Sequence, residues 1–156
     1  MSEARANHRV AYFNGRIVPE REVVLPFRDR GFKYGDAAFD MTRTFNGRPF
    51  KLKEHVDRLY RSLRYLRIDP GLAPAEMVAA SEAVLERNRH FLTPETDYWV
   101  GQRVSRGVNA VGDEGWDYTG PTVITFLSGG NMNVYSPWTV KTQTSATKRS
   151  KWPGQL

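Results

Sequence analysis

The chain has 156 residues, enough for one domain with a hydrophobic core. Its 23 lysines and arginines exceed its 17 aspartates and glutamates, and the formal net charge of +6 favours anionic partners such as phosphates or acidic small molecules. Cysteine is absent, which excludes disulfides, thiolate metal ligands and a cysteine nucleophile. Residues 1–10 are polar and no apolar run is long enough to span a membrane, so we expect a soluble cytoplasmic protein without membrane partners.

Two β-hairpins are predicted by Asn-Gly pairs that separate stretches of alternating side chains. The stretch RVAYFNGRIV turns at Asn14-Gly15, and a second hairpin from about Ala38 to Leu52 turns at Asn46-Gly47. Asn-Gly accepts the positive φ angles that tight hairpin turns require. The intervening stretch LPFRDRGFKYGDAAF has no clear period, and its mixture of glycines, charges and aromatic residues predicts a loop of the kind that carries function.

Two helices are predicted after the second hairpin. In the first, apolar residues recur at spacings of four and three, which is typical of an amphipathic helix. These residues are Leu52, Val56, Leu59, Leu63 and Leu66. Pro70-Gly71 is predicted to end this helix, and the second has Pro74 in its first turn and ends near Phe91.

Two β-rich stretches follow, TDYWVGQRVSRG and PTVITFL. The order of elements predicts an α+β domain, in which an antiparallel sheet of hairpins has two helices packed on one face. We expect this domain to span residues 8–126. Residues 127–156 are rich in Ser, Thr, Asn and Gly and predict a divergent, loosely ordered tail.

Arg58 is the strongest candidate for a binding residue on the first helix. It lies in the first turns and beside the apolar seam, where helix-terminal amides and a planar guanidinium could together hold a phosphate. The alternative is that Arg58 lies on a solvated face of the helix. We favour a solvated position for Arg61, Arg64 and Arg67, because residues three apart do not line up along one side of a helix.

Other site classes find little support in the sequence. The three histidines have no metal-ligand spacing, and we predict no metal site. They are His8, His55 and His90. The chain also lacks a G-x-S-x-G elbow, a dinucleotide fingerprint and a Walker loop. Three basic residues of the tail lie next to Trp152 and could contact nucleic acid, but so small a group favours a solvated terminus.

The stretch FRDRGFKYGDAAFDMTRTFNGRPFKLKEHVDRLYRSLRYLRIDP resembles the amino-terminal domain of class IV, or fold-type IV, pyridoxal-phosphate-dependent aminotransferases. The likeness runs from about His8 to about Phe126. It rests on the order of an aromatic-Asn-Gly hairpin, a D-R-G-aromatic motif, an E-H-x-x-R-L helix and an S-R-G turn. The group includes branched-chain aminotransferases, D-amino acid aminotransferases, (R)-selective amine transaminases and aminodeoxychorismate lyase.

The resemblance implies a cofactor, a function and a set of site residues. Arg58 would bind the 5′-phosphate of pyridoxal phosphate, and Tyr34, Phe39, Met41 and Trp99 would line the substrate pocket. The implied reaction transfers an amino group between a branched-chain amino acid, or a chiral amine, and a 2-oxo acid. Members of the family are homodimers. The turn VNAVGDEG lacks the arginine and histidine that D-amino acid enzymes use there, which disfavours that specificity.

The sequence departs from the family at the lysine that holds the cofactor. In the family this lysine lies in the carboxy-terminal domain. None of the six lysines here has the matching context: Lys33, Lys51, Lys53, Lys141, Lys148 and Lys151. We therefore assign no catalytic residue, and expect a truncated chain that does not transaminate alone. Two other functions stay open: a non-catalytic binding or assembly module, and a basic nucleic-acid-binding domain.

Overall fold

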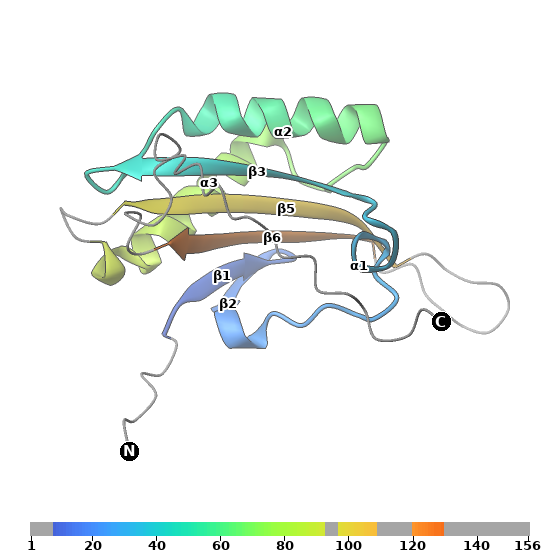
Figure 1. The fold of residues 1–156 in the computed structure, drawn as a ribbon, viewed down its shortest axis with the longest axis horizontal. Helices are drawn as coiled ribbons and strands as arrows, with labels where there is room; N and C mark the ends of the chain where they lie inside the picture. The colour runs from blue at the N-terminus through green and yellow to red at the C-terminus, as the bar shows by residue number, and fades with distance from the viewer. Residues whose placement is uncertain (1–7, 93–96, 109–119, 130–156) are drawn as a thin grey trace, which may run out of the picture.

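The computed structural model describes residues 8–92, 97–108 and 120–129, and these form one sheet with the two long helices on one side (Figure 1). The elements in chain order are β1 (Val10–Phe13), β2 (Arg16–Pro19), the 3-10 turn η1 (Glu20–Glu22), α1 (Arg30–Tyr34), β3 (Ala37–Phe45), β4 (Arg48–Pro49), α2 (Leu52–Leu66), α3 (Pro74–Arg87), the 3-10 turn η2 (Arg89–Phe91), β5 (Tyr98–Val108) and β6 (Gly120–Gly129). The strand order is β2-β1-β6-β5-β3-β4, and all pairings among the described strands are antiparallel. The predicted α+β class is confirmed.

Both predicted hairpins are present, and their turns have the expected backbone. Asn14 and Asn46 have φ angles of 45° and 50°, and the glycines after them have 91° and 72°. The hairpins are neighbours in sequence but not in the sheet. The first pairs with β6 through Tyr12 and Thr125, whereas β3 pairs with β5. The two long strands β5 and β6 therefore form the centre of the sheet, between the hairpins.

Helices α2 and α3 cover one face of the sheet, as the sequence predicted. Figure 1 shows α2 running along β3, with α3 alongside it nearer the middle of the sheet. The layer between helices and sheet is closed by apolar side chains, which include Val56, Leu59 and Leu63 of α2, Met77 and Val84 of α3, and Val104 and Val123 of the sheet. The burial of this layer is the main stabilising contribution to the fold.

Helix α2 ends earlier than the sequence predicted. Its last residue is Leu66, and Arg67 adopts a left-handed conformation with φ of 55°, well before Pro70-Gly71. The carbonyl oxygens of Leu66 and Arg67 accept hydrogen bonds from the guanidinium of Arg106 on β5, at 2.8 Å each. A side chain distant in sequence thus satisfies the helix end, which local sequence signals could not reveal.

The stretch predicted to be a loop contains the short helix α1, so that prediction was wrong for residues 30–34. Asp29 caps the helix by accepting hydrogen bonds from the backbone N–H groups of Gly31 and Phe32, and Gly35 ends it with φ of 69°. Asp29 is only 1% exposed and also accepts hydrogen bonds from the hydroxyls of Ser105 and Thr122. These four contacts fix α1 against one end of the sheet.

The second face of the sheet carries large side chains that the two long helices do not cover. Strand register places Phe39 of β3, Arg103 of β5 and Ile124 of β6 side by side on this face, with Met41, Gly101 and Phe126 in the next row. Phe39 is 68% exposed. We call this surface the outer face.

The structure describes only the start of the predicted tail. β6 continues to Gly129, and residues 130–156, the larger part of that tail, lie outside the described residues.

No helix in the described part of the chain is both long enough and apolar enough to cross a membrane.

Candidate functional site

Arg58, Asp40 and His55 form a compact charged cluster between α2 and β3. Arg58 donates from Nε to Asp40 Oδ2 at 2.7 Å and from Nη2 to Asp40 Oδ1 at 2.8 Å. His55 Nδ1 lies 2.7 Å from the same Oδ1 atom. Because a carboxylate only accepts hydrogen bonds, that contact requires the proton of the imidazole on Nδ1. Asp40 therefore fixes both side chains of α2.

The alternation of β3 and the period of α2 bring these residues together. On β3, Asp40, Thr42 and Thr44 point towards the helices and are buried, while Phe39 and Met41 point to the outer face. On α2, His55 and Arg58 are three residues apart, so they share one side of the helix. Arg58 lies beyond the first turn of α2, and its guanidinium donates hydrogen bonds to Asp40 on β3.

Electrostatics keep Asp40 and Arg58 of the cluster charged at neutral pH. Burial raises the pKa of Asp40, but hydrogen bonds from Arg58 and His55 outweigh it and hold the pKa below its usual value. The same pairing raises the pKa of Arg58. The Asp40 side chain is 4% exposed, whereas the Arg58 side chain is 59% exposed. The cluster thus joins a buried anion to a cation that solvent can reach.

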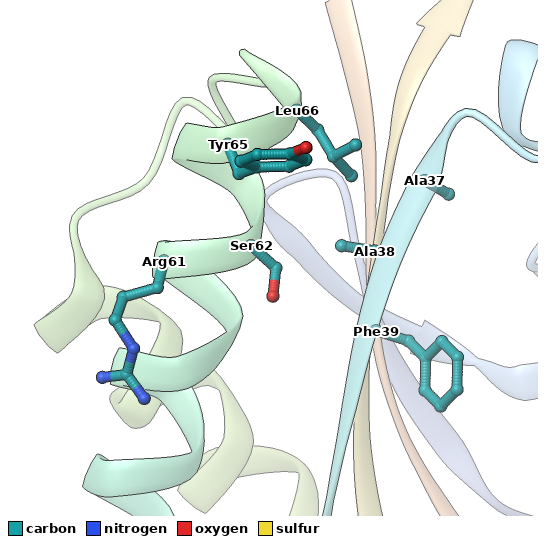
Figure 2. Close-up of a pocket in the computed structure, with 7 residues that line it drawn as sticks. All are labelled: Ala37, Ala38, Phe39, Arg61, Ser62, Tyr65 and Leu66. Carbon is teal, nitrogen blue, oxygen red and sulfur yellow. The ribbon is translucent and has the colours of Figure 1, made fainter.

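An open groove of about 550 Å³ begins beside the cluster, between α2 and β3. Figure 2 shows Ser62 and Leu66 of α2 facing Ala38 of β3 across this groove, while the ring of Phe39 lies on the far side of β3. Ser62 is one helical turn from Arg58 and its hydroxyl donates to the Arg58 carbonyl at 3.4 Å. β4 pairs with β3 only at Thr44 and Phe45, so the groove follows the otherwise open edge of the described sheet.

Three of the predicted pocket residues lie together on the outer face, but Tyr34 does not join them. Strand register places Trp99 of β5 opposite Arg43 of β3. This pair lies next to the row that holds Met41 and Gly101. A Cβ added at Gly101 would lie 2.5 Å from Met41 Sδ, so the glycine leaves the space that Met41 fills.

Phe39, Met41 and Trp99 therefore form one wall, on the opposite side of β3 from Arg58. Tyr34 lies at the end of α1 and is 65% exposed, with the Nζ of Lys33 4.8 Å from its ring centre. The neighbouring lysine lowers the pKa of the Tyr34 hydroxyl. Tyr34 lines neither the groove nor the cavity described below.

Comparison with known proteins identifies the family of the chain. The family model described as amino-transferase class IV matches residues 37–152, well over half of the chain. The chain belongs to the class IV aminotransferase family. Family members use pyridoxal phosphate, and they include aminotransferases and a lyase.

Several relatives of this class IV chain have different activities. It is 39% identical over 101 residues to a putative branched-chain-amino-acid aminotransferase of Methanocaldococcus jannaschii, covering 65% of this chain and 33% of that protein. It is 32% identical over 117 residues to aminodeoxychorismate lyase of Bacillus subtilis, with coverage of 75% and 39%. It is 34% identical over 77 residues to D-alanine aminotransferase of Bacillus licheniformis, with coverage of 49% and 27%.

Solved structures of the family share the fold. The chain is similar to the T.th. branched-chain amino acid aminotransferase with pyridoxamine 5′-phosphate, with a TM-score of 0.66 and 25% identity, covering 81% of this chain and 42% of that one. A second structure of that enzyme, complexed with N-(5′-phosphopyridoxyl)-L-glutamate, has the same TM-score and identity. The chain spans less than half the length of each of these relatives.

One residue of the class IV chain, Arg58, has donors that an anion such as a phosphate could reach. Asp40 occupies Nε and Nη2 of Arg58, which leaves the Nη1 donors without a partner among the described residues. An anion could approach them because Arg58 is more than half exposed.

Each of the three described lysines has its Nζ atom near another group: Lys33 near the Tyr34 ring, Lys51 near the Phe50 ring and Lys53 near Asp57. The other three lysines lie outside the described residues, as does the basic group of the tail.

Sequence reasoning missed two partners of the predicted site residues. Asp40 could have been noticed, because it alternates with Thr42 and Thr44 on a strand that a helix was predicted to cover. The contact between Arg103 and Phe39 could not have been noticed, because it depends on the register of β3 against β5.

Among the described residues no group of three or more histidines and carboxylates could hold a metal ion.

Proposed function

We propose that this chain provides the phosphate-binding residue and the substrate wall of a pyridoxal-phosphate-dependent transaminase. The proposed reaction moves an amino group between a branched-chain amino acid and a 2-oxo acid. One observation carries the proposal: Arg58, held by buried Asp40, and the wall of Phe39, Met41 and Trp99 lie on the two sides of the sheet at β3, whose outer edge pairs with β4 only at Thr44 and Phe45. A cofactor at the edge of β3 could contact both.

Each of these residues has a defined part in the proposed mechanism. Pyridoxal phosphate, when bound, supplies the reactive carbonyl and the electron sink for amino transfer. Arg58 binds its phosphate, and Asp40 holds the guanidinium in one orientation so that less freedom is lost on binding. Phe39, Met41 and Trp99 contact the aliphatic side chain of the substrate and exclude water from it.

The choice of a branched-chain substrate over a chiral amine has two supports. The wall is apolar, which suits an aliphatic side chain, and the relative from Methanocaldococcus jannaschii is a putative branched-chain-amino-acid aminotransferase. Turnover by a full-length relative separates the substrates. Leucine with 2-oxoglutarate should be turned over faster than a chiral aryl amine, and the reverse order would favour the amine.

The phosphate role of Arg58 is tested by titrating the 156-residue chain with pyridoxal phosphate and with pyridoxal. We expect Arg58→Met to weaken pyridoxal phosphate binding about tenfold or more, because one charge-assisted contact contributes about 1.5–3 kcal/mol. Pyridoxal, which lacks the phosphate, should bind both chains alike. Arg61→Met is the matched control, an exposed arginine one turn along. Equal binding of pyridoxal phosphate by both variants would exclude the assignment.

We further propose that the 156-residue chain does not itself catalyse amino transfer. The support is that the Nζ atoms of the three described lysines each contact another group: the ring of Tyr34, the ring of Phe50 or the carboxylate of Asp57. Incubation with pyridoxal phosphate, reduction with borohydride and mass spectrometry provide the test. We expect scattered, substoichiometric labelling. Stoichiometric labelling of a single lysine, together with turnover, would contradict the proposal.

A second candidate function, an assembly module, is favoured by the exposed aromatic residues of the outer face. Phe39 is 68% exposed and Phe45 is 48% exposed, and exposed apolar surface is typical of interaction sites when it is extensive. Sedimentation measurements provide the test: a homodimer would support assembly, and a monomer at all concentrations would exclude self-assembly.

A further inference from the structure

A cavity of about 320 Å³ lies at the end of the outer face, apart from the groove beside Arg58. It opens between the segment that precedes α1 and the central strands. Its apolar side consists of Leu25, Phe32 and Ile124, and Arg103 lines it as well. The volume is at the low end of the range of about 300–1,000 Å³ that is usual for small-molecule sites. The cavity therefore suits a small amphiphile.

Arg103 differs from the ion-paired arginines in the described part of the chain, because it has no carboxylate partner there. Arg30, Arg43, Arg58, Arg89 and Arg106 each form an ion pair with an aspartate or glutamate. Arg103 instead contacts two aromatic rings: its guanidinium carbon lies 5.8 Å from the centre of Phe39 and 5.3 Å from the centre of Phe126. Such stacking orients a guanidinium and leaves its N–H donors directed outwards, available to an anion.

The carboxylate that lines the same cavity, Asp29, does not neutralise Arg103. Its Oδ1 atom accepts from the N–H groups of Gly31 and Phe32, and its Oδ2 atom accepts from the hydroxyls of Ser105 and Thr122. Groups of the protein therefore donate to both oxygens of Asp29, and this residue is only 1% exposed. The negative charge is therefore distributed over a buried hydrogen-bond network, and the guanidinium is left as the polar group at the cavity.

We propose that this cavity binds the carboxylate form of a small aliphatic acid. Arg103 pairs with the carboxylate, and the alkyl chain lies against Leu25, Phe32 and Ile124. Planar guanidinium and carboxylate groups match in a two-bond pairing, and the apolar side of the cavity removes the alkyl chain from water.

The carboxylate site does not rest on the proposed transaminase function. Its apolar side, Leu25, Phe32 and Ile124, contains none of the residues of the wall that the proposed function assigns to the side chain of the substrate.

The test is a calorimetric titration of the full 156-residue chain with three probes of the same alkyl skeleton: 4-methylpentanoate, the neutral 4-methylpentanamide and the cationic 4-methylpentan-1-amine. We expect the carboxylate to bind at least tenfold more tightly than either of the others. Arg103→Gln should abolish that preference, and Arg103→Lys should retain part of it. The matched control Arg87→Gln, an exposed arginine on α3, should leave it unchanged.

Three results would overturn the proposal: equal binding of carboxylate and amide, retention of the preference in Arg103→Gln, or its loss in Arg87→Gln. Ile124→Trp provides a second variant that fills the cavity and keeps the arginine, and it should weaken carboxylate binding. A pyridoxal phosphate titration of the unmodified chain, beside its titration with 4-methylpentanoate, keeps the two proposals distinguishable. Carboxylate binding without pyridoxal phosphate binding would refute only the transaminase function, and pyridoxal phosphate binding without a carboxylate preference would refute only the Arg103 site.

Discussion

Replacing Arg58 by methionine tests the cluster on which the candidate site depends. Methionine keeps an unbranched apolar stem and removes the guanidinium, so both hydrogen bonds to Asp40, of 2.7 and 2.8 Å, are lost. A hydrogen bond to a charged group contributes about 1.5–3 kcal/mol. Because the Arg58 side chain is 59% exposed, water screens the pair, and we expect a total loss of about 2 kcal/mol in the free energy of unfolding.

Urea unfolding of the 156-residue chain at pH 7, followed by circular dichroism, measures this loss. Arg61→Met removes an exposed arginine from the same helix and should change stability by less than about 0.5 kcal/mol. A double-mutant cycle with Asp40→Asn isolates the pair, and a coupling energy of about 1–2 kcal/mol is expected. The reasoning fails if Arg58→Met and Arg61→Met cost the same, or if the effects of Arg58→Met and Asp40→Asn simply add.

Three further predictions concern residues that hold the fold together. A hydrogen bond from Arg106 holds the pKa of Asp36 below its usual value, so its stabilising contribution is present above about pH 4 and is lost as pH falls through the lowered pKa. Unfolding measured from pH 7 to pH 2 should show a shallower acid loss for Asp36→Asn than for the unmodified chain. Gly31→Ala should cost about 1–3 kcal/mol in urea unfolding, because the added Cβ would lie 2.6 Å from the Ser105 Cβ; a loss below about 0.5 kcal/mol would show that α1 is not closely packed. Asn88→Ala should cost about 2–3 kcal/mol, since this fully buried amide both donates to and accepts from the backbone of β1, and faster hydrogen exchange of β1 should accompany the loss.

Local signals in the sequence were sufficient for the elements themselves. Asn14-Gly15 and Asn46-Gly47 fold into turns because few other residue pairs accept consecutive positive φ angles. The spacing from Leu52 to Leu66 gives a helix because it places the apolar residues on one side at 3.6 residues per turn. The cap at Asp29 is also a local signal, and it was missed because a helix of five residues has no measurable period.

The candidate site was only partly accessible to sequence reasoning. Arg58 and the wall of Phe39, Met41 and Trp99 came from resemblance to a family, and their roles stay predictions. Alternation along β3 separated its side chains into two sets, but did not indicate which set the helices cover. Apolar burial alone would have put Phe39 and Met41 under α2, and the structure places them outside.

The sequence by itself determined where the strands and long helices lie and how the hairpins turn, because backbone preferences and hydrophobic periods act over a few neighbouring residues. Only the tertiary structure decided which face of β3 is covered and which cations remain available to an anion. Asp40 can point inwards because Arg58 and His55, from a different element, supply its hydrogen bonds. Arg103 lies between two rings because three strands align in register, and pairing across strands depends on the whole sheet.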